Sequence, residues 1–233
     1  MPQTPSPPGS IVPPGEPAPG TPTGDPLVAD PMVADPAGDP DATLPSRLAA
    51  SAIVEAAEVI AEAKVATDQE LRGRRLRLFA FDVDGTLTDG TIYIGGQGEV
   101  MKAFSVHDGH ALVAMRQAGW KIALITGRSS SIVERRAEEL GIEIVMQGVG
   151  DKAQALREAC ARAGVGLEDA GFMGDDWPDL PAMRAAAFAA TVADAPDEIR
   201  DAAHWVATRP PGKGAVRELA DWLLRLRGEW RMP

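Results

Sequence analysis

Two carboxylates separated by one residue, Asp82 and Asp84, directly follow the apolar run at 79–81. Two acids at the end of a buried strand repel each other, and their burial is costly unless a cation or a substrate requires them. Gly85 then lets the chain turn sharply, and Thr86 follows it. An acidic turn that simply closes a strand is the alternative explanation. The pair is therefore a candidate reactive centre that needs support from elsewhere in the chain.

Two further clusters have features suited to holding a phosphate group. Thr126, Gly127 and Arg128 follow the apolar run at 121–125, where a hydroxyl and backbone N–H groups at the start of a helix can bind phosphate oxygens. An N-cap with a turn glycine would give the same pattern. Lys152 opens another predicted helix, where the helix dipole disfavours a cation. A lysine there is sensible if it neutralises a phosphate or a carboxylate, and a surface lysine is the alternative.

The fourth cluster is Gly-Asp-Asp-Trp-Pro-Asp at 174–179, with three acids within five residues after the run Ala-Gly-Phe-Met. Grouped carboxylate oxygens are typical ligands of a hard cation such as Mg²⁺. A helix N-cap at Asp176 or Asp179 would explain one of the acids, but not all three. The cluster therefore predicts a magnesium site.

The elements that position these clusters alternate between strand and helix. Strands are predicted at 76–81, 121–126, 142–146, 170–174, 188–193 and 204–208. Helices are predicted at 109–117, 129–140, 152–163, 179–186, 196–203 and 214–227. This alternation predicts an α/β fold with a doubly wound, Rossmann-like parallel sheet, whose active site lies at the carboxyl ends of the strands. Two extended runs at 91–94 and 99–106, joined by a glycine-rich loop, predict a β-hairpin after the first cluster.

The first 46 residues differ in composition from the rest. They contain 14 of the 20 prolines, six acids and no Lys or Arg, and so carry 6 of the 11 net negative charges. Proline blocks helix and sheet pairing, and little apolar surface is available to offset ordering entropy. We predict a disordered, Pro-rich acidic tail at 1–46, with a docking arm as the alternative. A helical N-terminal extension should cover 47–73 and stop at Gly73, and the catalytic domain should cover 74–233.

Several functional classes are disfavoured by the same composition. An acidic chain without a basic stripe is a poor candidate for binding nucleic acid. A single cysteine, Cys160, excludes a disulfide within the chain and a cysteine-based zinc site. No apolar run approaches the ~20 residues that span a bilayer, and the N-terminus lacks the pattern of a secretory signal or transit peptide. We therefore expect a cytoplasmic protein without a membrane or nucleic-acid partner.

The four clusters, in their order and at their strand ends, resemble the motifs of the haloacid dehalogenase-like phosphohydrolases. Those motifs are FAFDVDGTLTDG (79–90), LITGR (124–128), QGVGDK (147–152) and MGDDWPDLP (173–181). The segments KAFSVHDG (102–109), VADAP (192–196) and GKGAVREL (212–219) are similar to one subgroup, the 3-deoxy-D-manno-octulosonate 8-phosphate (KDO 8-phosphate) phosphatases. The resemblance covers about residues 75–228. It implies a phosphatase of lipopolysaccharide precursor synthesis that acts on an acidic sugar phosphate.

The spacing of the motifs leaves no room for the separate cap domain that many members of this superfamily insert. Asp82 and Thr126 are 44 residues apart, which a hairpin and one helix largely fill, and Thr126 and Lys152 are 26 residues apart. In the resembling subgroup, the hairpin and a neighbouring subunit cover the site within a homotetramer. The resemblance therefore implies a capless homotetramer, in which the hairpin would be about residues 90–106.

The resemblance also implies a role for each matching residue. Asp82 would attack the phosphorus to form an aspartyl-phosphate, and Asp84 would act as general acid and then as general base. Mg²⁺ would be bound by Asp82, the backbone carbonyl of Asp84, and Asp175. The transferring phosphoryl group would be held by Thr126, Gly127 and Lys152. The remaining matching residues would contact the substrate or the residues that bind the metal: Thr86, His107, Arg128 and Asp176.

His107 departs from the subgroup, which usually has Arg at this position. A guanidinium can hold a carboxylate or phosphate through two hydrogen bonds, whereas a mostly neutral histidine offers fewer donors. The substrate carboxylate is then held differently, or the specificity has changed, or His107 contacts no ligand. Alternatives are therefore a phosphatase of a nonulosonate 9-phosphate, or a non-catalytic relative used for assembly. The intact Asp82, Asp84, Lys152 and Asp175 argue against loss of catalysis.

Overall fold

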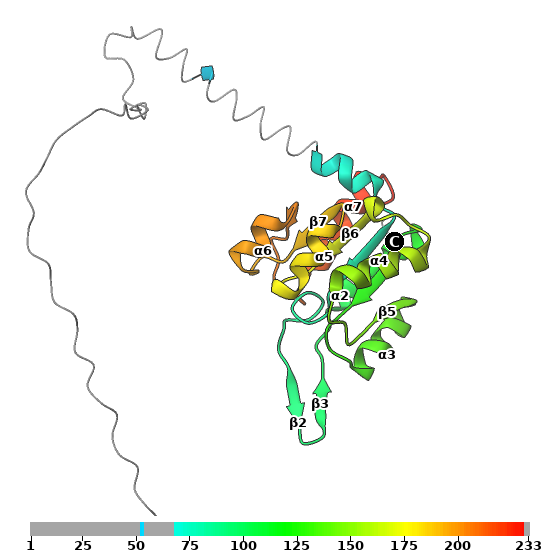
Figure 1. Ribbon diagram of the computed structural model, residues 1–233, viewed down its shortest axis with the longest axis vertical. Helices are drawn as coiled ribbons and strands as arrows, with labels where there is room; N and C mark the ends of the chain where they lie inside the picture. Colours follow the sequence, from blue (N-terminus) through cyan, green and yellow to red (C-terminus); the bar gives the residue numbers. More distant parts are fainter. Residues whose placement is uncertain (1–51, 54–67, 231–233) are drawn as a thin grey trace, which may run out of the picture. The chain divides into compact units, whose positions relative to one another are not determined.

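A parallel sheet of six strands forms the centre of the protein, in the order β5-β4-β1-β6-β7-β8 (Figure 1). The computed structural model describes residues 52–53 and 68–230, so the predicted tail at 1–46 and most of the predicted extension at 47–73 lie outside the described residues. The strands are β1 (Leu78–Phe81), β4 (Lys121–Ile125), β5 (Ile144–Met146), β6 (Ala170–Met173), β7 (Phe188–Thr191) and β8 (Trp205–Val206). The predicted parallel sheet is confirmed.

The sheet is buried because its central strands are continuous apolar runs. Every residue of β1, β6 and β7 is buried, as expected for parallel strands covered on both faces. From β1 the chain builds outward through β4 and β5, and then returns to the other side of β1 to build β6, β7 and β8. The strand order therefore reverses beside β1, and ligands of such sheets bind at the carboxyl ends of the strands at this point.

The helices fall into two groups that pack beside the sheet. One group contains α2 (Val106–Gln117), α3 (Ser131–Leu140) and α7 (Ala215–Leu226), with α2 in contact with both others. The other contains α4 (Lys152–Ala163), α5 (Leu180–Ala185) and α6 (Asp197–Ala202), with α5 in contact with both others. Two short 3-10 turns, η1 (Leu167–Asp169) and η2 (Trp177–Asp179), flank β6. Crossovers between parallel strands are right-handed in nearly all proteins, and with this strand order they place the two groups on opposite faces, which makes the sheet doubly wound.

The predicted hairpin is present, but it is shorter than the sequence indicated. Strands β2 (Tyr93–Gly95) and β3 (Gly98–Met101) pair antiparallel and project from the body of the molecule (Figure 1). Helix α2 begins at Val106, three residues earlier than predicted, because the Ser105 hydroxyl accepts a hydrogen bond from the Asp108 N–H and caps the helix. The predicted return strand at 99–106 therefore ends at Met101.

Gly73 does not end the helix that precedes the sheet, contrary to the sequence prediction. Residues 68–75 are helical, so the helix continues past this glycine. A β-carbon at Gly73 would lie 2.7 Å from Leu226 Cδ2 and 3.1 Å from the Trp222 ring. The glycine therefore allows this helix to approach α7 closely.

Within the described residues, no helix combines the length and the apolar character needed to cross a bilayer.

Candidate active site

Asp82 lies at the carboxyl edge of the sheet, where β1 ends. Its backbone N–H donates to the Met173 carbonyl with an N···O distance of 2.9 Å, which extends the β1–β6 pairing by one residue. The residue after Met173 leads into Asp175, so the acids of the first and fourth clusters begin on neighbouring strands. The Asp82 side chain is buried, with 3% of the residue exposed. The strand pairing therefore brings two predicted site residues to one point.

Asp175 is held against the turn that follows β1. The Thr86 hydroxyl donates to Asp175 Oδ1 with an O···O distance of 3.0 Å. Gly85 has a φ of +94°, and a β-carbon there would lie 2.0 Å from Asp175 Oδ2. A residue with a side chain would therefore occupy the space that the Asp175 carboxylate fills. The sequence motifs implied only an outer role for Thr86, and the structure places it in direct contact with Asp175.

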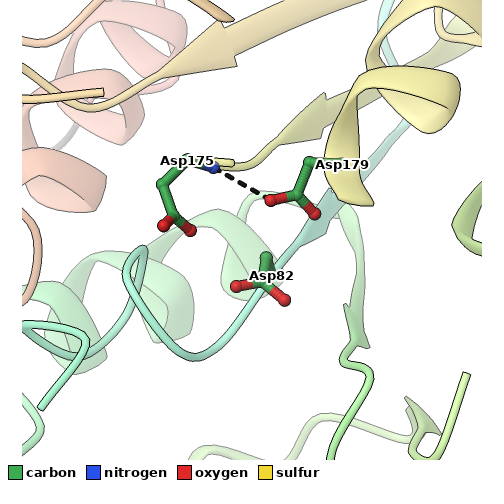
Figure 2. Close-up of side chains that lie close together, drawn as sticks. All are labelled: Asp82, Asp175 and Asp179. Carbon is green, nitrogen blue, oxygen red and sulfur yellow. Dashed lines mark hydrogen bonds between the residues drawn. The ribbon is translucent and has the colours of Figure 1, made fainter. Parts of the chain in front are cut away.

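A third acid, Asp179, completes the cluster, although the sequence placed it only in the acidic run at 174–179 and assigned it no role of its own. One carboxylate oxygen each of Asp82, Asp175 and Asp179 lies within 4.8 Å of the other two. Figure 2 shows the three side chains close together. Asp179 is buried, and its Oδ2 accepts the N–H groups of Asp175 and Asp176 at 3.0 and 3.2 Å. Asp176 is the N-cap of η2, and Asp179 completes the capping box from the third position of that turn. The sequence does contain a hint of the contact with Lys152, because Gly-Asp-Asp-Trp-Pro-Asp has more acids than a helix cap needs.

Lys152 links Asp82 to Asp179. Its Nζ lies 2.6 Å from Asp82 Oδ1 and 2.6 Å from Asp179 Oδ1. Lys152 is the first residue of α4, and the preceding Asp151 caps the helix by accepting the Gln154 N–H. Burial alone would lower the pKa of Lys152, but the two carboxylates raise it above its ordinary value. Lys152 is therefore a fixed cation inside the acid cluster, which rules out the surface-lysine alternative.

One lysine does not balance three carboxylates. Burial and the neighbouring Asp179 raise the pKa of Asp82 well above its usual range. The same causes raise the pKa of Asp175 to about 7. A divalent cation between Asp82 and Asp175 would remove this repulsion, and carboxylate oxygens suit Mg²⁺. Asp179 already accepts bonds from Lys152 and from two backbone N–H groups, so Asp82 and Asp175 are the two acids that would bind the ion.

Asp84 lies apart from this cluster, and its side chain faces different partners. Lys102, which follows β3, forms an ion pair with Asp84 Oδ1. Arg128 Nε lies 4.0 Å from Asp84 Oδ2. Lys102 is a second residue that the sequence patterns did not identify, although it stands in the quoted segment KAFSVHDG. Two acids only two residues apart therefore occupy separate environments.

The Thr126 loop reaches the same edge of the sheet from β4. Leu124 pairs with Phe81, so Thr126 lies one residue farther along its strand than Asp82 does. Its backbone N–H donates to the Met146 carbonyl at 2.9 Å, and its hydroxyl accepts the Arg128 N–H at 3.4 Å. Thr126 is buried, whereas Gly127 and Arg128 are exposed. The loop thus presents the exposed Gly127 backbone beside the strand end.

Two predicted residues lie at the periphery. His107 is exposed in the first turn of α2, a helix that the sequence predicted to begin only at residue 109. The Asp176 side chain is exposed and accepts the Trp177 N–H at 2.8 Å. That His107 and Asp176 contact the substrate or the residues that bind the metal stays a prediction.

Comparisons with known proteins match this chain to a hydrolase family and to curated phosphatases. A family model described as haloacid dehalogenase-like hydrolase matches residues 109–187. The 3-deoxy-D-manno-octulosonate 8-phosphate phosphatase KdsC of Yersinia pestis is 40% identical over 160 residues, which cover 69% of this chain and 86% of the relative. This match therefore covers more than two thirds of both chains.

Solved structures of similar proteins have the same fold. The 3-deoxy-D-manno-octulosonate 8-phosphate phosphatase of Moraxella catarrhalis, in complex with magnesium ion, phosphate ion and KDO, is 41% identical, with a TM-score of 0.66 over 68% of this chain and 91% of the other. The cobalt-bound phosphatase of Haemophilus influenzae is 36% identical, with a TM-score of 0.67 over 67% of this chain and 92% of the other. Both relatives carry a divalent metal ion.

Proposed function

This chain belongs to the haloacid dehalogenase-like hydrolases, and we propose that it is a Mg²⁺-dependent phosphatase that converts KDO 8-phosphate to KDO and phosphate. The observation that carries the proposal is the contact of Asp82 with Lys152, beside Asp175. A nucleophilic carboxylate, a fixed cation and a second acid able to bind Mg²⁺ are the groups that phosphoryl transfer requires. The names of the relatives support the choice of substrate.

The first half of the reaction transfers the phosphoryl group to the protein. Asp82 attacks the phosphorus, the bond to the sugar oxygen breaks, and Asp84 gives its proton to that oxygen. Lys152 and the Gly127 N–H stabilise the phosphoryl oxygens, and Thr126 fixes the loop that carries Gly127. When bound by Asp82 and Asp175, Mg²⁺ would neutralise phosphoryl charge and orient the group for attack.

The second half returns the protein to its starting state. Asp84, now ionised, takes a proton from a water molecule that attacks the phosphorus of the aspartyl-phosphate. The bond between phosphorus and the Asp82 oxygen breaks, and inorganic phosphate leaves. Lys152 then forms its ion pair with the regenerated Asp82 carboxylate again.

Release of inorganic phosphate from KDO 8-phosphate tests this function. We expect turnover with Mg²⁺, loss of turnover after chelation, and recovery when Mg²⁺ is added back. Asp82→Asn should abolish turnover with the fold retained, since the change keeps the size of the side chain. A panel of sugar-acid phosphates, including a nonulosonate 9-phosphate, ranked by kcat/KM, tests the substrate. Near wild-type turnover by Asp82→Asn would refute the nucleophile, and a preference for another sugar acid would refute the substrate.

We also propose that the hairpin pairs between subunits in a homotetramer, as the resemblance to the subgroup implies. Its large apolar side chains are exposed: Ile92 by 41%, Ile94 by 72%, Val100 by 61% and Met101 by 50%. An isolated two-stranded ribbon is marginally stable and its edges favour pairing with other strands. Val100→Asp should dissociate the assembly in multi-angle light scattering, whereas Val206→Asp, at an exposed valine outside the hairpin, should not. A fully active wild-type monomer would contradict the proposal.

A cytoplasmic site of action is likewise our proposal. Cys160 is a free thiol buried in the core, and burial raises its pKa, so it has little tendency to react. Such a cysteine is compatible with the reducing conditions of the cytoplasm. Fractionation of cells that produce the untagged chain tests the compartment, and recovery of the protein in any other fraction would contradict the proposal.

A further inference from the structure

A buried row of polar side chains connects the β-hairpin to Asp84. Lys102 Nζ forms an ion pair with Asp84 Oδ1 and lies 2.8 Å from Glu99 Oε1. The second oxygen of Glu99 accepts a hydrogen bond from the hydroxyl of Ser130, which precedes α3. The side chains of Lys102, Glu99 and Asp84 are only 2%, 13% and 17% exposed. The row therefore spans the loop after β1, the return strand of the hairpin and the start of α3.

The burial of Lys102 shows that its position is tightly fixed. A lysine side chain that reaches solvent samples many conformations, but one that is 2% exposed and bound by two carboxylates has little freedom. Glu99 is itself fixed by Ser130. Asp84 is consequently held by a partner whose own place is set from the other side, which is how supporting residues orient a reactive group.

The two oxygens of Asp84 differ in what they contact. Oδ1 is bound by Lys102, whereas Oδ2 is buried and has no hydrogen-bond partner among the described residues. Arg128 Nε lies 4.0 Å from Oδ2, which is beyond hydrogen-bonding distance. A buried acceptor without a partner is rare and calls for an explanation. The explanation offered by the proposed reaction is that Oδ2 exchanges a proton with the sugar oxygen that leaves the phosphorus.

We propose that Lys102, held by Glu99 and Ser130, is a positioning residue that orients the Asp84 carboxyl so that Oδ2 faces the leaving oxygen of the substrate. The inference rests on the proposed function and adds a residue to it. It separates the roles of two lysines, because Lys152 contacts the nucleophile Asp82 whereas Lys102 contacts the acid Asp84. It also connects the hairpin with the proton-transfer step, since both Glu99 and Lys102 belong to the hairpin and the segment just after it.

Two substrates distinguish a role of Lys102 in positioning Asp84 from a role in stabilising the fold or binding phosphate. The sugar oxygen of KDO 8-phosphate is a poor leaving group and needs a proton, whereas p-nitrophenolate leaves p-nitrophenyl phosphate without one. The kcat/KM ratio reports only the steps up to release of the leaving group, so the later attack of water does not enter it. Lys102→Met should lower kcat/KM for KDO 8-phosphate about 100-fold, as expected for a displaced general acid, and should lower it far less for p-nitrophenyl phosphate.

Three further variants and one substitute complete the experiment. Lys102→Arg, which keeps the charge, should retain more activity on the sugar phosphate than Lys102→Met does. Lys121→Met, at an exposed lysine on β4, should match the wild type with both substrates. Addition of Lys102→Met to Asp84→Asn should cause no further loss on the sugar phosphate, because both changes remove the same step. If Lys102→Met melts below the assay temperature, Glu99→Gln carries the same test with a smaller change.

The outcomes are distinguishable. Equal losses on the two substrates would overturn the proposal, since a lysine that stabilises the fold or the phosphate charge would affect both. An unchanged kcat/KM for both substrates would overturn it as well. A wild-type protein that releases phosphate from neither substrate with Mg²⁺ would overturn the proposed function and this inference with it. Selective loss on the sugar phosphate, absent from the Lys121→Met control, would support it.

Discussion

Gly85→Ala tests whether the position of Asp175 depends on the missing side chain at the turn after β1. A β-carbon at this position would lie 2.0 Å from Asp175 Oδ2, whereas ordinary contacts begin at 3.4 Å. The carboxylate would have to move by the difference, about 1.4 Å, because atoms cannot overlap at this range. Such a move would break the 3.0 Å hydrogen bond from Thr86 and displace one of the two carboxylates that would bind Mg²⁺.

The expected size of the effect follows from this displacement. A misplacement of about 1 Å in a reacting assembly can lower the rate about 100-fold, so kcat should fall by at least this factor. The φ of +94° adds a separate cost of about 1–2 kcal/mol for a residue with a β-carbon. For a domain of this size, that cost lowers Tm by roughly 2–4 °C per kcal/mol.

Gly119→Ala provides the matched control, because Gly119 has a φ of +93° but no atom within 4 Å of the place that a β-carbon would take. Both variants should lose similar stability from backbone strain, and only Gly85→Ala should lose activity and Mg²⁺ affinity. Phosphate release, Mg²⁺ titration calorimetry and thermal melts measure the three quantities. Wild-type Mg²⁺ affinity in Gly85→Ala, or an equal loss of activity in Gly119→Ala, would refute the reasoning.

Three further predictions concern charge and the N-terminal segment. The pKa of Asp175 is raised from 3.8 to about 7, so between these values the folded metal-free protein binds more protons than the unfolded chain, and this group makes stability fall as pH rises. Mg²⁺ should therefore raise Tm more at about pH 8 than at about pH 6, and equal increments in calorimetry would contradict the assignment. Asp179→Asn should lower stability by about 1–3 kcal/mol and move the pH midpoint of Mg²⁺ binding down, because Asp179 raises the pKa of Asp175. Asp176→Asn should move this midpoint less, because Asp176 raises the pKa of Asp175 by a smaller amount; an unshifted midpoint in Asp179→Asn, or an equal shift in Asp176→Asn, would argue against the prediction. Deletion of residues 1–40 should leave kcat and Tm nearly unchanged, since this proline-rich stretch offers few apolar side chains to bury, and a clear drop in Tm would show otherwise.

The backbone arrangement of the site was predictable because it depends on patterns that are local in the sequence. Each apolar run is a strand, and parallel strands end at one edge of a sheet. Asp82, Thr126 and Asp175 follow three such runs, and the structure places them at the ends of the neighbouring strands β1, β4 and β6. Their assembly therefore follows from strand order alone.

The side-chain contacts were less predictable because they join segments far apart in the chain. Asp179 contacts Lys152 across 27 positions, and Lys102 contacts Asp84 across 18. Nothing in the residue types near Asp179 separates a residue of a capping box from a partner of a buried lysine, and in the structure it is both. The prediction that Gly73 ends a helix is wrong because the contact that requires a glycine there is also distant in sequence. It is the close packing against Leu226, at the other end of the domain.

The distribution of charge around the two acids of the first motif explains how they can have different tasks. Asp82 shares one lysine with Asp179 and faces Asp175, so its side of the site carries more carboxylates than cations. A dianionic phosphate could not approach three carboxylates with Lys152 alone to balance them, because like charges at this range repel strongly. A divalent cation at Asp82 and Asp175 would cancel the two remaining negative charges, so the proposed nucleophile could then meet its substrate. The Asp84 side chain contacts a separate lysine and lies outside this cluster, so the proton transfer that we propose for it uses a different carboxyl group from the proposed metal site.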